Sequence, residues 1–267
     1  MRELERLSEP SDHETALSVA IVGAGRLGTA LACALVQSGI RVDGPLGRGA
    51  LPAGVDAVLL CVPDAEIAAA AAPIRAGQLV GHCSGATGLE ALAGREAFSL
   101  HPLMTLPGGN EARHAPGSAP DSGPSPFSGA TAAIAGTSPA ALTFARRLAI
   151  ALGLRPALIA DGDRAAYHAA ASIASNFVLT LEAAAERLAA TAGLGRADLV
   201  PLVRATVENW ASLGAERALT GPVARGDEQT VERQRQAVAE RMPELRTLFD
   251  ELVEATRALA GPIGTAP

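Results

Sequence analysis

Lysine is missing from this sequence, and all 22 of its basic residues are arginine. A guanidinium cannot give up its proton in a protein, so any proton that this chain transfers must come from another kind of side chain. Aromatic residues are also scarce, at 3% of the chain. Alanine, leucine and valine must therefore fill the interior. This composition favours helices that pack closely through small side chains, and it argues against a large ligand held by stacking.

Several targeting and binding signals are absent as well. The formal net charge is −6 and the arginines are scattered, so we expect neither nucleic acid nor an anionic membrane as a partner. No run of about 20 apolar residues is free of charge, so we expect no membrane span. The first sixteen residues contain no apolar segment of the kind found in signal peptides. We therefore expect a cytoplasmic protein.

The three cysteines, Cys33, Cys61 and Cys83, are odd in number and none are spaced as CxxC. They indicate reduced, mostly buried thiols rather than a disulfide framework. No pair of histidines or cysteines has the spacing of metal ligands, so we expect no metal site.

The first part of the chain alternates between strand and helix patterns. Apolar runs suited to buried strands occupy residues 17–23, 40–42, 55–62, 98–100, 127–136 and 155–159. A further strand is expected just before His82. Helical segments, among them 27–38 and 139–152, separate these runs. The alternation predicts an α/β fold of the Rossmann type, a doubly wound parallel sheet with right-handed crossovers.

The character of the sequence changes near residue 160, where strand patterns vanish. Helices are predicted over residues 163–191, 197–213, 227–241 and 243–260. We expect a disordered tail over 1–15, a Rossmann domain over 16–160 and an all-α domain over 161–267. Within the Rossmann domain, residues 107–126 are rich in Pro, Gly and Ser and predict a flexible insertion.

A glycine-rich stretch, GAGRLG, follows the first predicted strand and opens a predicted helix. In this context Gly23 permits a tight turn, Gly25 lets the backbone approach a pyrophosphate, and Gly28 allows the helix to pack closely on the strand. Phosphates would meet the free N–H groups of the helix N-terminus, where Arg26 and Leu27 lie. We predict that these five residues bind a dinucleotide. The alternative is a structural turn without a ligand.

Residues near the end of the second predicted strand bear on the choice of dinucleotide. Proteins that bind NAD usually place an acidic residue about 20 residues past the glycines, and Asp43 keeps that possibility open. Arg48 lies at a similar distance from Gly28, and its guanidinium could fork onto a ribose 2′-phosphate. Such a charge-assisted contact contributes about 1.5–3 kcal/mol. We therefore expect NADP(H); the alternative for Arg48 is a solvated surface charge.

Polar groups follow three further predicted strands. Ligands bind at the carboxyl ends of the strands in this architecture. We expect Val62, Pro63 and Ser84 to contact the cofactor, and His82 and His101 to contact the substrate. For each histidine, a structural hydrogen bond to the backbone is an equal alternative.

Two more polar groups lie in the helical part. His168, Ser172 and Asn176 are spaced at i, i+4 and i+8 and would share one face of a helix. There they would either bond within the core or face the cofactor. Arg225 and Asp227 lie between two predicted helices. They would contact a substrate carboxylate, or else form a helix cap with its ion partner.

Seven stretches are distinctive when taken together: GAGRLGTAL, LLCVPDAEI, HCSGATGLEAL, SLHPLMTL, FSGATAAIAG, YHAAASIASNF and LTGPVARGD. They resemble Rossmann-like proteins with a DUF2520 C-terminal domain, many of which are described as NADP oxidoreductases. The resemblance extends over residues 16–260 and is specific for the family but not for a substrate. It implies kinship with ketopantoate reductases, pyrroline-5-carboxylate reductases and the 6-phosphogluconate dehydrogenase C-terminal-like superfamily. These relatives often dimerise through their helices.

The resemblance also implies roles on the long helix. Ketopantoate reductases carry there a lysine and two asparagines at four-residue intervals. By position, His168 stands where the lysine is, Ser172 where the first asparagine is, and Asn176 matches the second. Because lysine is missing, we expect His168 to donate the proton, for which an imidazole is suited near neutral pH. Asn176 would hold the carbonyl oxygen.

The sequence therefore predicts an NADP(H)-dependent oxidoreductase that reduces a small, carboxylate-bearing 2-oxo acid or a related carbonyl, as ketopantoate reductases do. One alternative is an imine reductase of the pyrroline-5-carboxylate reductase type, whose iminium substrate carries its own proton. Another is a non-catalytic NADP(H)-binding sensor or scaffold. We expect a homodimer through the helical domain, since alanine-rich helices bury their small faces well against a second copy.

Overall fold

The computed structural model describes residues 17–47, 49–50, 52, 54–106 and 125–261. The chain forms two compact units, Met1–Ser172 and Ile173–Pro267. The domain boundary expected near residue 160 stays a prediction. The predicted tail, 1–15, and residues 107–124 of the predicted insertion lie outside the described residues.

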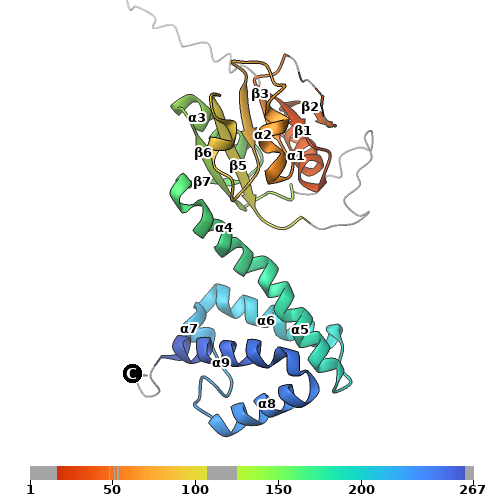
Figure 1. Ribbon diagram of the computed structural model, residues 1–267, viewed down its shortest axis with the longest axis vertical. Coiled ribbons are helices and arrows are strands. Elements are labelled where there is room, and N and C mark those ends of the chain that lie inside the picture. Colours follow the sequence, from red (N-terminus) through yellow and green to blue (C-terminus); the bar gives the residue numbers. More distant parts are fainter. Residues whose placement is uncertain (1–16, 48, 51, 53, 107–124, 262–267) are drawn as a thin grey trace, which may run out of the picture. The chain divides into compact units, whose positions relative to one another are not determined.

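The first unit is built on a seven-stranded sheet with the order β2-β1-β3-β4-β5-β6-β7 (Figure 1). The strands are β1 Ser18–Val22, β2 Arg41–Leu46, β3 Ala57–Leu60, β4 Leu79–His82, β5 Ala97–Leu103, β6 Thr131–Gly136 and β7 Arg155–Leu158. Pairing is parallel except between β5 and β6. The predicted Rossmann fold class is confirmed.

The antiparallel pairing of β6 with β5 differs from the fully parallel sheet that the sequence predicts. A parallel neighbour needs a crossover, usually a helix, that returns the chain to the starting edge. The sequence between these strands is rich in Pro, Gly and Ser instead of helix formers, and the chain re-enters the sheet in the opposite direction. The pairing also lengthens β5, so His101 lies inside the strand, opposite Ala133, and not after it.

Helices cover both faces of the sheet because successive strand residues point to opposite sides. On one face, Val19 and Ile21 pack with the helices α1, Arg26–Gln37, and α3, Pro139–Ala151. On the other, Ala20 and Val22 pack with α2, Ile67–Ala71, and the short 3-10 helix η2, Leu89–Leu92. Small apolar side chains dominate both layers, as the scarcity of aromatic residues predicts.

The long helix predicted over 163–191 is present but interrupted. It consists of α4, Arg164–Ser172, a π-helical turn, η5, Ile173–Phe177, and α5, Val178–Ala190. A π turn has more residues per turn than an α-helix. The argument that residues at i, i+4 and i+8 share one face therefore does not extend through Asn176.

The second unit is all-helical. After η5 and α5 it contains α6 Arg196–Leu213, α7 Ala215–Ala218, α8 Glu228–Arg241, the 3-10 turn η6 Pro243–Leu245 and α9 Arg246–Ala260. The short helix α7 is not predicted by the sequence pattern. Pro243 opens η6, in keeping with the preference of proline for a first helical position.

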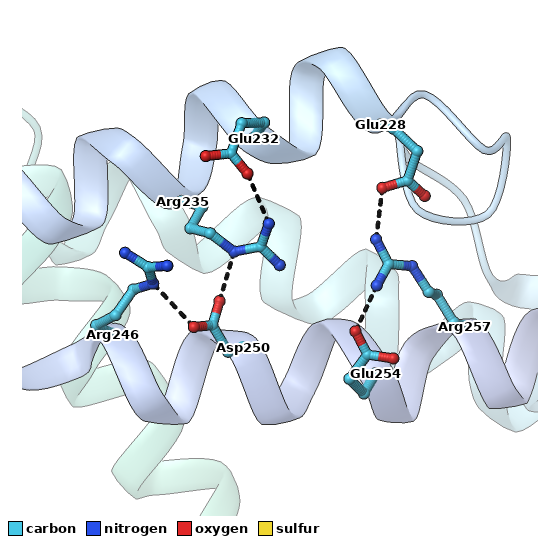
Figure 2. Close-up of polar contacts among 7 residues, drawn as sticks. All are labelled: Glu228, Glu232, Arg235, Arg246, Asp250, Glu254 and Arg257. Carbon is cyan, nitrogen blue, oxygen red and sulfur yellow. Dashed lines mark hydrogen bonds and ion pairs between the residues drawn. The ribbon is translucent and has the colours of Figure 1, made fainter.

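Ion pairs join α8 to α9 in the second unit (Figure 2). Arg235 of α8 bridges to Asp250 of α9 at 2.7 Å between Nε and Oδ1, and Arg257 of α9 bridges back to Glu228 at 2.5 Å between Nη2 and Oε2. Arg246 binds the second oxygen of Asp250 at 2.8 Å. The hydrogen bonds from Arg235 and Arg246 hold the pKa of Asp250 below its usual value. These pairs are partly exposed, so their attraction is screened by salt.

Two further expectations bear on the described residues. Cys33 is exposed on α1, Cys61 is half-buried and Cys83 is buried, so the expectation of mostly buried thiols is wrong for Cys33, which falls on the solvent side of an amphipathic helix. Among the described residues, no helix is both long enough and apolar enough to span a bilayer.

Candidate active site

Four parallel strands end at one edge of the sheet, which we term the carboxyl edge. Their register places Val22 of β1 beside Leu60 of β3, Leu60 beside His82 of β4, and His82 beside Ser99 of β5. The segments that follow β1, β3 and β4 therefore leave the sheet at a similar height, beside Ser99 of β5, which continues to Leu103. In an open α/β sheet this edge is where ligands bind.

The glycine-rich segment after β1 is packed as tightly as its sequence predicts. Gly23 has φ +116°, and a Cβ there would lie 2.3 Å from the carbonyl oxygen of Cys61. A Cβ on Gly28 would lie 1.9 Å from the carbonyl oxygen of Gly23. Gly25 differs, because a Cβ on it would meet nothing within 4 Å. The two outer glycines are thus required by packing, while Gly25 faces open space.

The N-terminus of α1 is available to an anion. Gly25 is its N-cap, no side chain caps it, and no acidic residue stands in its first turn. The helix dipole and the free N–H groups of such a terminus favour a negative group. Arg26 is exposed and donates from Nη1 to the carbonyl of Leu106 at 3.3 Å, whereas Leu27 packs against the core.

The residues expected to choose between NADP and NAD are only partly described. Arg48 lies outside the described residues. Asp43 is exposed on β2, in a strand that hydrogen-bonds to the glycine-rich segment through Gly23 N and Leu46 O at 2.9 Å.

Ser84 organises the segment after β4. Its hydroxyl donates to Oδ2 of Asp64 at 2.7 Å and accepts from the backbone N–H groups of Ala86 and Thr87 at 3.2 and 2.9 Å. Thr87 donates to the same Asp64 oxygen at 3.1 Å. Asp64 opens the 3-10 turn η1, Asp64–Glu66, which follows Pro63. The segments after β3 and β4 are therefore tied together at the carboxyl edge.

Three other expected site residues lie at the ends of β3 and β4. Val62 packs against the core and Pro63 is exposed. His82 is fully buried. Its Nδ1 accepts from the backbone N–H of Ser84 at 3.2 Å, so in the neutral ring Nε2 carries the proton and donates to the carbonyl of Gly88, also at 3.2 Å. Burial lowers the pKa of His82 and favours this neutral form, which supports the structural alternative for this residue.

His101, Tyr167 and His168 form a cluster where β5 meets the first turns of α4. The Tyr167 hydroxyl lies 2.7 Å from Nδ1 of His101. The two rings meet edge to face, with centroids 5.7 Å apart. His168 is exposed, and its ring centroid lies 6.1 Å from that of His101. A buried strand and an exposed helix thus supply three polar rings to one place.

Gly85 makes room for this cluster. A Cβ there would lie 2.8 Å from Cε1 of His101 and 2.9 Å from Cδ2 of His168. The backbone after β4 therefore passes directly against both imidazoles. A larger residue at this position would displace the rings.

Arg164 anchors the beginning of α4 to the sheet. Its side chain is only 3% exposed and donates from Nη2 to Oγ of the buried Ser99 at 2.6 Å. Its Nε donates to Asp161 at 2.8 Å, in the 3-10 turn η4, Asp161–Asp163. Burying a charge away from water is costly unless the charge is paired and hydrogen-bonded. Asp161 and Ser99 are the partners of this guanidinium. Tyr167, one turn further along α4, takes its position from this anchor.

His101 is neutral at physiological pH. Burial, first, and the positive charge of His168, second, lower the pKa of His101 to about 4. Arg164 and His82 act in the same direction and Asp64 opposes them. Burial also raises the pKa of Tyr167, with Arg164 opposing. At pH 7 the cluster therefore holds a neutral imidazole and a protonated phenol.

The remaining predicted site residues are not brought into this cluster by any described contact. Ser172 ends α4, and Asn176 is exposed in the π turn, where its carbonyl accepts from Thr180 at 3.1 Å. Asp227 caps α8 by accepting from the backbone N–H of Thr230 at 3.0 Å, a bond that lowers its pKa. Arg225 is exposed. The cap supports the structural alternative for Asp227.

Sequence reasoning does not find three residues of the site. Arg164 reads as one more scattered arginine, and the burial that distinguishes it comes from the sheet. Tyr167 stands beside His168 in the sequence, and its being the chain's single tyrosine is the signal that could have drawn attention to it. Gly85 has an ordinary backbone conformation, so only its neighbours explain it.

Cys61 and Cys83, with Sγ atoms 3.7 Å apart, lie just beneath the glycine-rich segment. The hydrogen bond with the Cys61 thiol, first, and burial, second, raise the pKa of Cys83, so this thiol is not activated as a nucleophile. Within the described part of the chain, no group of three or more His, Cys, Asp or Glu side chains gathers closely enough to hold a metal ion.

Part of this chain matches a known protein family. Residues 130–256 match a family model described as a domain of unknown function, DUF2520. The resemblance inferred from the sequence motifs is thereby confirmed, and the match begins before β6, inside the sheet-bearing unit. No curated protein has a sequence that matches this chain significantly.

Solved structures share the fold of this chain. A Bacteroides fragilis protein, provisionally assigned as an NADP oxidoreductase, is 20% identical with a TM-score of 0.73 over 91% of this chain and 98% of that chain. Protein TM1727 of Thermotoga maritima is 24% identical with a TM-score of 0.69 over the same shares. The 1-pyrroline-5-carboxylate reductase of Streptococcus pyogenes is 13% identical with a TM-score of 0.57 over 91% and 99%. At these identities the likeness concerns the fold.

The pKa of His101 yields a prediction that needs no ligand. In an NMR titration its ring should gain a proton only near pH 4, and the variant His168→Ala should raise this midpoint because a neighbouring positive charge is removed. The midpoint should stay below the unperturbed value of about 6.5, since burial is the larger cause. An unfolded chain binds this proton at about 6.5, so acidification between these two values destabilises the fold. A midpoint near 6.5 in the wild-type protein would contradict the burial of His101.

Proposed function

We propose that this protein is an NADP(H)-dependent oxidoreductase that reduces a small 2-oxo acid or a related carbonyl. The observation that carries the proposal is the uncapped N-terminus of α1, with open space at Gly25 between two glycines that packing requires. A pyrophosphate fits such a terminus, because the helix offers free N–H groups and a positive dipole end. Gly23, Gly25, Arg26, Leu27 and Gly28 would hold it there.

Further residues would complete the cofactor site. Val62 and Pro63 follow β3 at the carboxyl edge, next to the segment that Ser84 organises. Arg48 would bind the 2′-phosphate, which is the basis for preferring NADP(H) over NAD; Asp43 is the residue that would favour NAD. The provisional assignment of the Bacteroides fragilis protein as an NADP oxidoreductase agrees with this preference.

A bound reduced nicotinamide would supply the hydride. A carbonyl that accepts a hydride at carbon must also gain a proton at oxygen. The protein would have to supply this proton. His168 is exposed beside His101 at the carboxyl edge, and it would donate that proton. Asn176 and Ser172 would orient the carbonyl, and Arg225 and Asp227 would contact the substrate, as their positions in the sequence predict.

Two other functions are retained. The Streptococcus pyogenes relative is a 1-pyrroline-5-carboxylate reductase, which favours reduction of an imine as the second candidate. A non-catalytic sensor or scaffold that binds NADP(H) is the third. Incubation with NADPH and a panel of 2-oxo acids and cyclic imines, followed at the absorbance of the reduced nicotinamide, separates the three. Binding without turnover of any of them would favour the sensor.

The variant Gly25→Ala tests the cofactor site. A Cβ at Gly25 meets no protein atom within 4 Å, so the thermal stability of the variant should match the wild type. The methyl group would occupy the approach of the pyrophosphate, and the loss of charge-assisted hydrogen bonds should weaken NADPH binding by roughly 10- to 100-fold. Isothermal titration calorimetry measures this change.

Gly162→Ala is the matched control for Gly25→Ala. A Cβ added to Gly162 would also meet nothing within 4 Å, and this glycine lies in η4, outside the glycine-rich segment. The substitution should change neither stability nor NADPH affinity. Equal NADPH affinity in the Gly25→Ala and Gly162→Ala proteins would remove the phosphate site from α1.

The variant His168→Ala tests the proton donor and discriminates between the two substrate classes. With a carbonyl substrate, kcat should fall by roughly 10²–10⁴-fold, the contribution of a general acid, while the Kd for NADPH stays unchanged. Added imidazole should restore part of the rate. With an iminium substrate the loss should be small, because that substrate brings its own proton. An unchanged kcat with a 2-oxo acid excludes His168 as the donor.

We also propose that the helical unit forms a homodimer. Among the described residues of this unit, only Val231, Val238, Met242 and Val253 are buried apolar side chains. The 18-residue helix α6 has no buried residue and exposes Leu202, Val207, Trp210 and Leu213. Helices in proteins derive most of their stability from packing an apolar face, so a second copy is the expected cover.

Sedimentation velocity should therefore show a particle of two chains, and Trp210→Asp should shift it toward one. Trp210 is 60% exposed, as is Ile150 on α3 of the other unit, so Ile150→Asp is a control of equal exposure that should leave the dimer intact. Dissociation by both variants alike, or a wild-type protein that sediments as one chain, would count against an interface at α6.

A further inference from the structure

Tyr167 and His101 make a short polar contact in the candidate site. The proposed mechanism gives this contact no role. The phenol oxygen and Nδ1 of His101 are 2.7 Å apart. Contacts within the fold fix the elements that carry both side chains. His101 is paired in the sheet with Ala133, and α4 is bound to Ser99 through the buried Arg164. A polar pair fixed so rigidly at a carboxyl edge is suited to aim one hydrogen atom.

The position of the single ring proton of His101 decides where that hydrogen points. His101 is neutral, so one of its two nitrogens carries a proton. If Nε2 carries it, the Tyr167 O–H must donate to Nδ1. Its hydrogen is then bound within the protein and is not available to a substrate. If Nδ1 carries it, the N–H donates to the phenol oxygen, and the O–H hydrogen is left to point away from His101.

We propose that His101 carries its proton on Nδ1 and that Tyr167, oriented by this bond, donates its O–H to the reacting oxygen or nitrogen of the substrate. Tyr167 is then a catalytic residue and His101 a positioning residue. The proposal rests on the proposed reductase function and adds to it a hydrogen-bond donor that the sequence comparison with ketopantoate reductases does not supply.

The chemistry of the reduction requires a donor of this kind. As the hydride pair forms a bond to the carbonyl carbon, the C=O π pair moves onto oxygen, and His168 supplies the proton that this oxygen finally gains. A fixed donor aimed at the developing charge stabilises the transition state more than the ground state. Burial raises the pKa of Tyr167, so its hydrogen is present throughout the physiological range.

The surroundings of the pair favour negative charge on that oxygen. The groups that act on His101 are His168, Arg164 and His82, together with the carboxylate of Asp64. Arg164 is permanently positive and its charge lowers the pKa of Tyr167. Asp64 is the one acidic group among them, and its Oδ2 is occupied by the hydroxyls of Ser84 and Thr87. The charge of Arg164 therefore favours an oxyanion at the cluster.

The tautomer of His101 can be measured without any substrate. Two-dimensional ¹H–¹⁵N NMR on histidine-labelled full-length protein reports which ring nitrogen is protonated, with His101→Asn to assign the signal. The proposal expects the proton on Nδ1. A proton on Nε2 overturns it, because the phenol hydrogen would then be bound to His101.

Two substitutions of His101 form a matched pair. Asparagine places its amide nitrogen where Nδ1 of histidine lies, whereas glutamine places its amide near Nε2. His101→Asn should keep kcat within a few-fold of the wild type, and His101→Gln should lose roughly 10-fold or more, the effect of one hydrogen bond at a charge. The Kd for NADPH should be unchanged in both. Equal kcat values in the two variants would contradict orientation of Tyr167 through Nδ1.

The tyrosine itself can be changed by one atom, because Tyr167 is the single tyrosine of the chain. Biosynthetic 3-fluorotyrosine therefore modifies this position alone. A fluorinated phenol ionises at lower pH, so the alkaline loss of kcat should move to lower pH together with the phenolate absorbance near 295 nm. Tyr167→Phe should lower kcat by roughly 10²–10³-fold. Its Kd for NADPH should equal that of the wild type.

The outcomes separate this proposal from the function on which it rests. The assays use NADPH with ketopantoate and with 1-pyrroline-5-carboxylate. A wild-type protein that binds and oxidises NADPH, beside a Tyr167→Phe variant of equal kcat, overturns the role of Tyr167 alone. A wild-type protein that does not bind NADPH overturns the reductase and this role together. If NADPH binds but neither substrate is reduced, the His101 tautomer decides.

Discussion

The carbonyl oxygen of Gly23 lies against the Cα of Gly28, so closely that a Cβ would stand 1.9 Å away. This approach pins the first turn of α1 onto the end of β1, and the rest of the proposed cofactor site depends on it. With α1 so placed, its uncapped N–H groups open at the carboxyl edge beside Gly25. The same approach rests on β3, because Gly23 in turn packs against the carbonyl of Cys61. A change at either outer glycine would therefore disturb the sheet and the proposed phosphate site together.

The sequence predicts best those features of the structure that depend only on residues close together in the chain. The roles of Gly23 and Gly28, the strands and most helix ends follow from short patterns, because a tight turn or a buried strand restricts its own residues. The direction of β6 does not, since it depends on how residues 104–130 return to the sheet. The π turn at Ile173–Phe177 is likewise invisible to a count of helical spacing. Arg48 remains a prediction because it lies outside the described residues.

The candidate site shows the same division. His168 and His101 stand out in the sequence as titratable groups near strand and helix ends, but their meeting requires β5 and α4 to come together. Arg164 is exposed by every local rule and is nevertheless buried, because Ser99 and Asp161 receive its guanidinium. The absence of lysine, visible at once in the sequence, bears on the chemistry of this site. The first turns of α4 carry an imidazole, His168, and a phenol, Tyr167.

The reversed direction of β6 has a consequence for how this protein can vary. Leu103, the last residue of β5, is paired with Thr131, the first of β6, so the stretch between them leaves and re-enters the sheet at neighbouring points on the carboxyl edge. The entropy of closing a loop between two fixed, adjacent ends rises only slowly with its length. Residues can thus be gained or lost between them at little thermodynamic expense, without altering a single strand pairing. The chain can therefore change in length between β5 and β6 while the sheet itself stays constant.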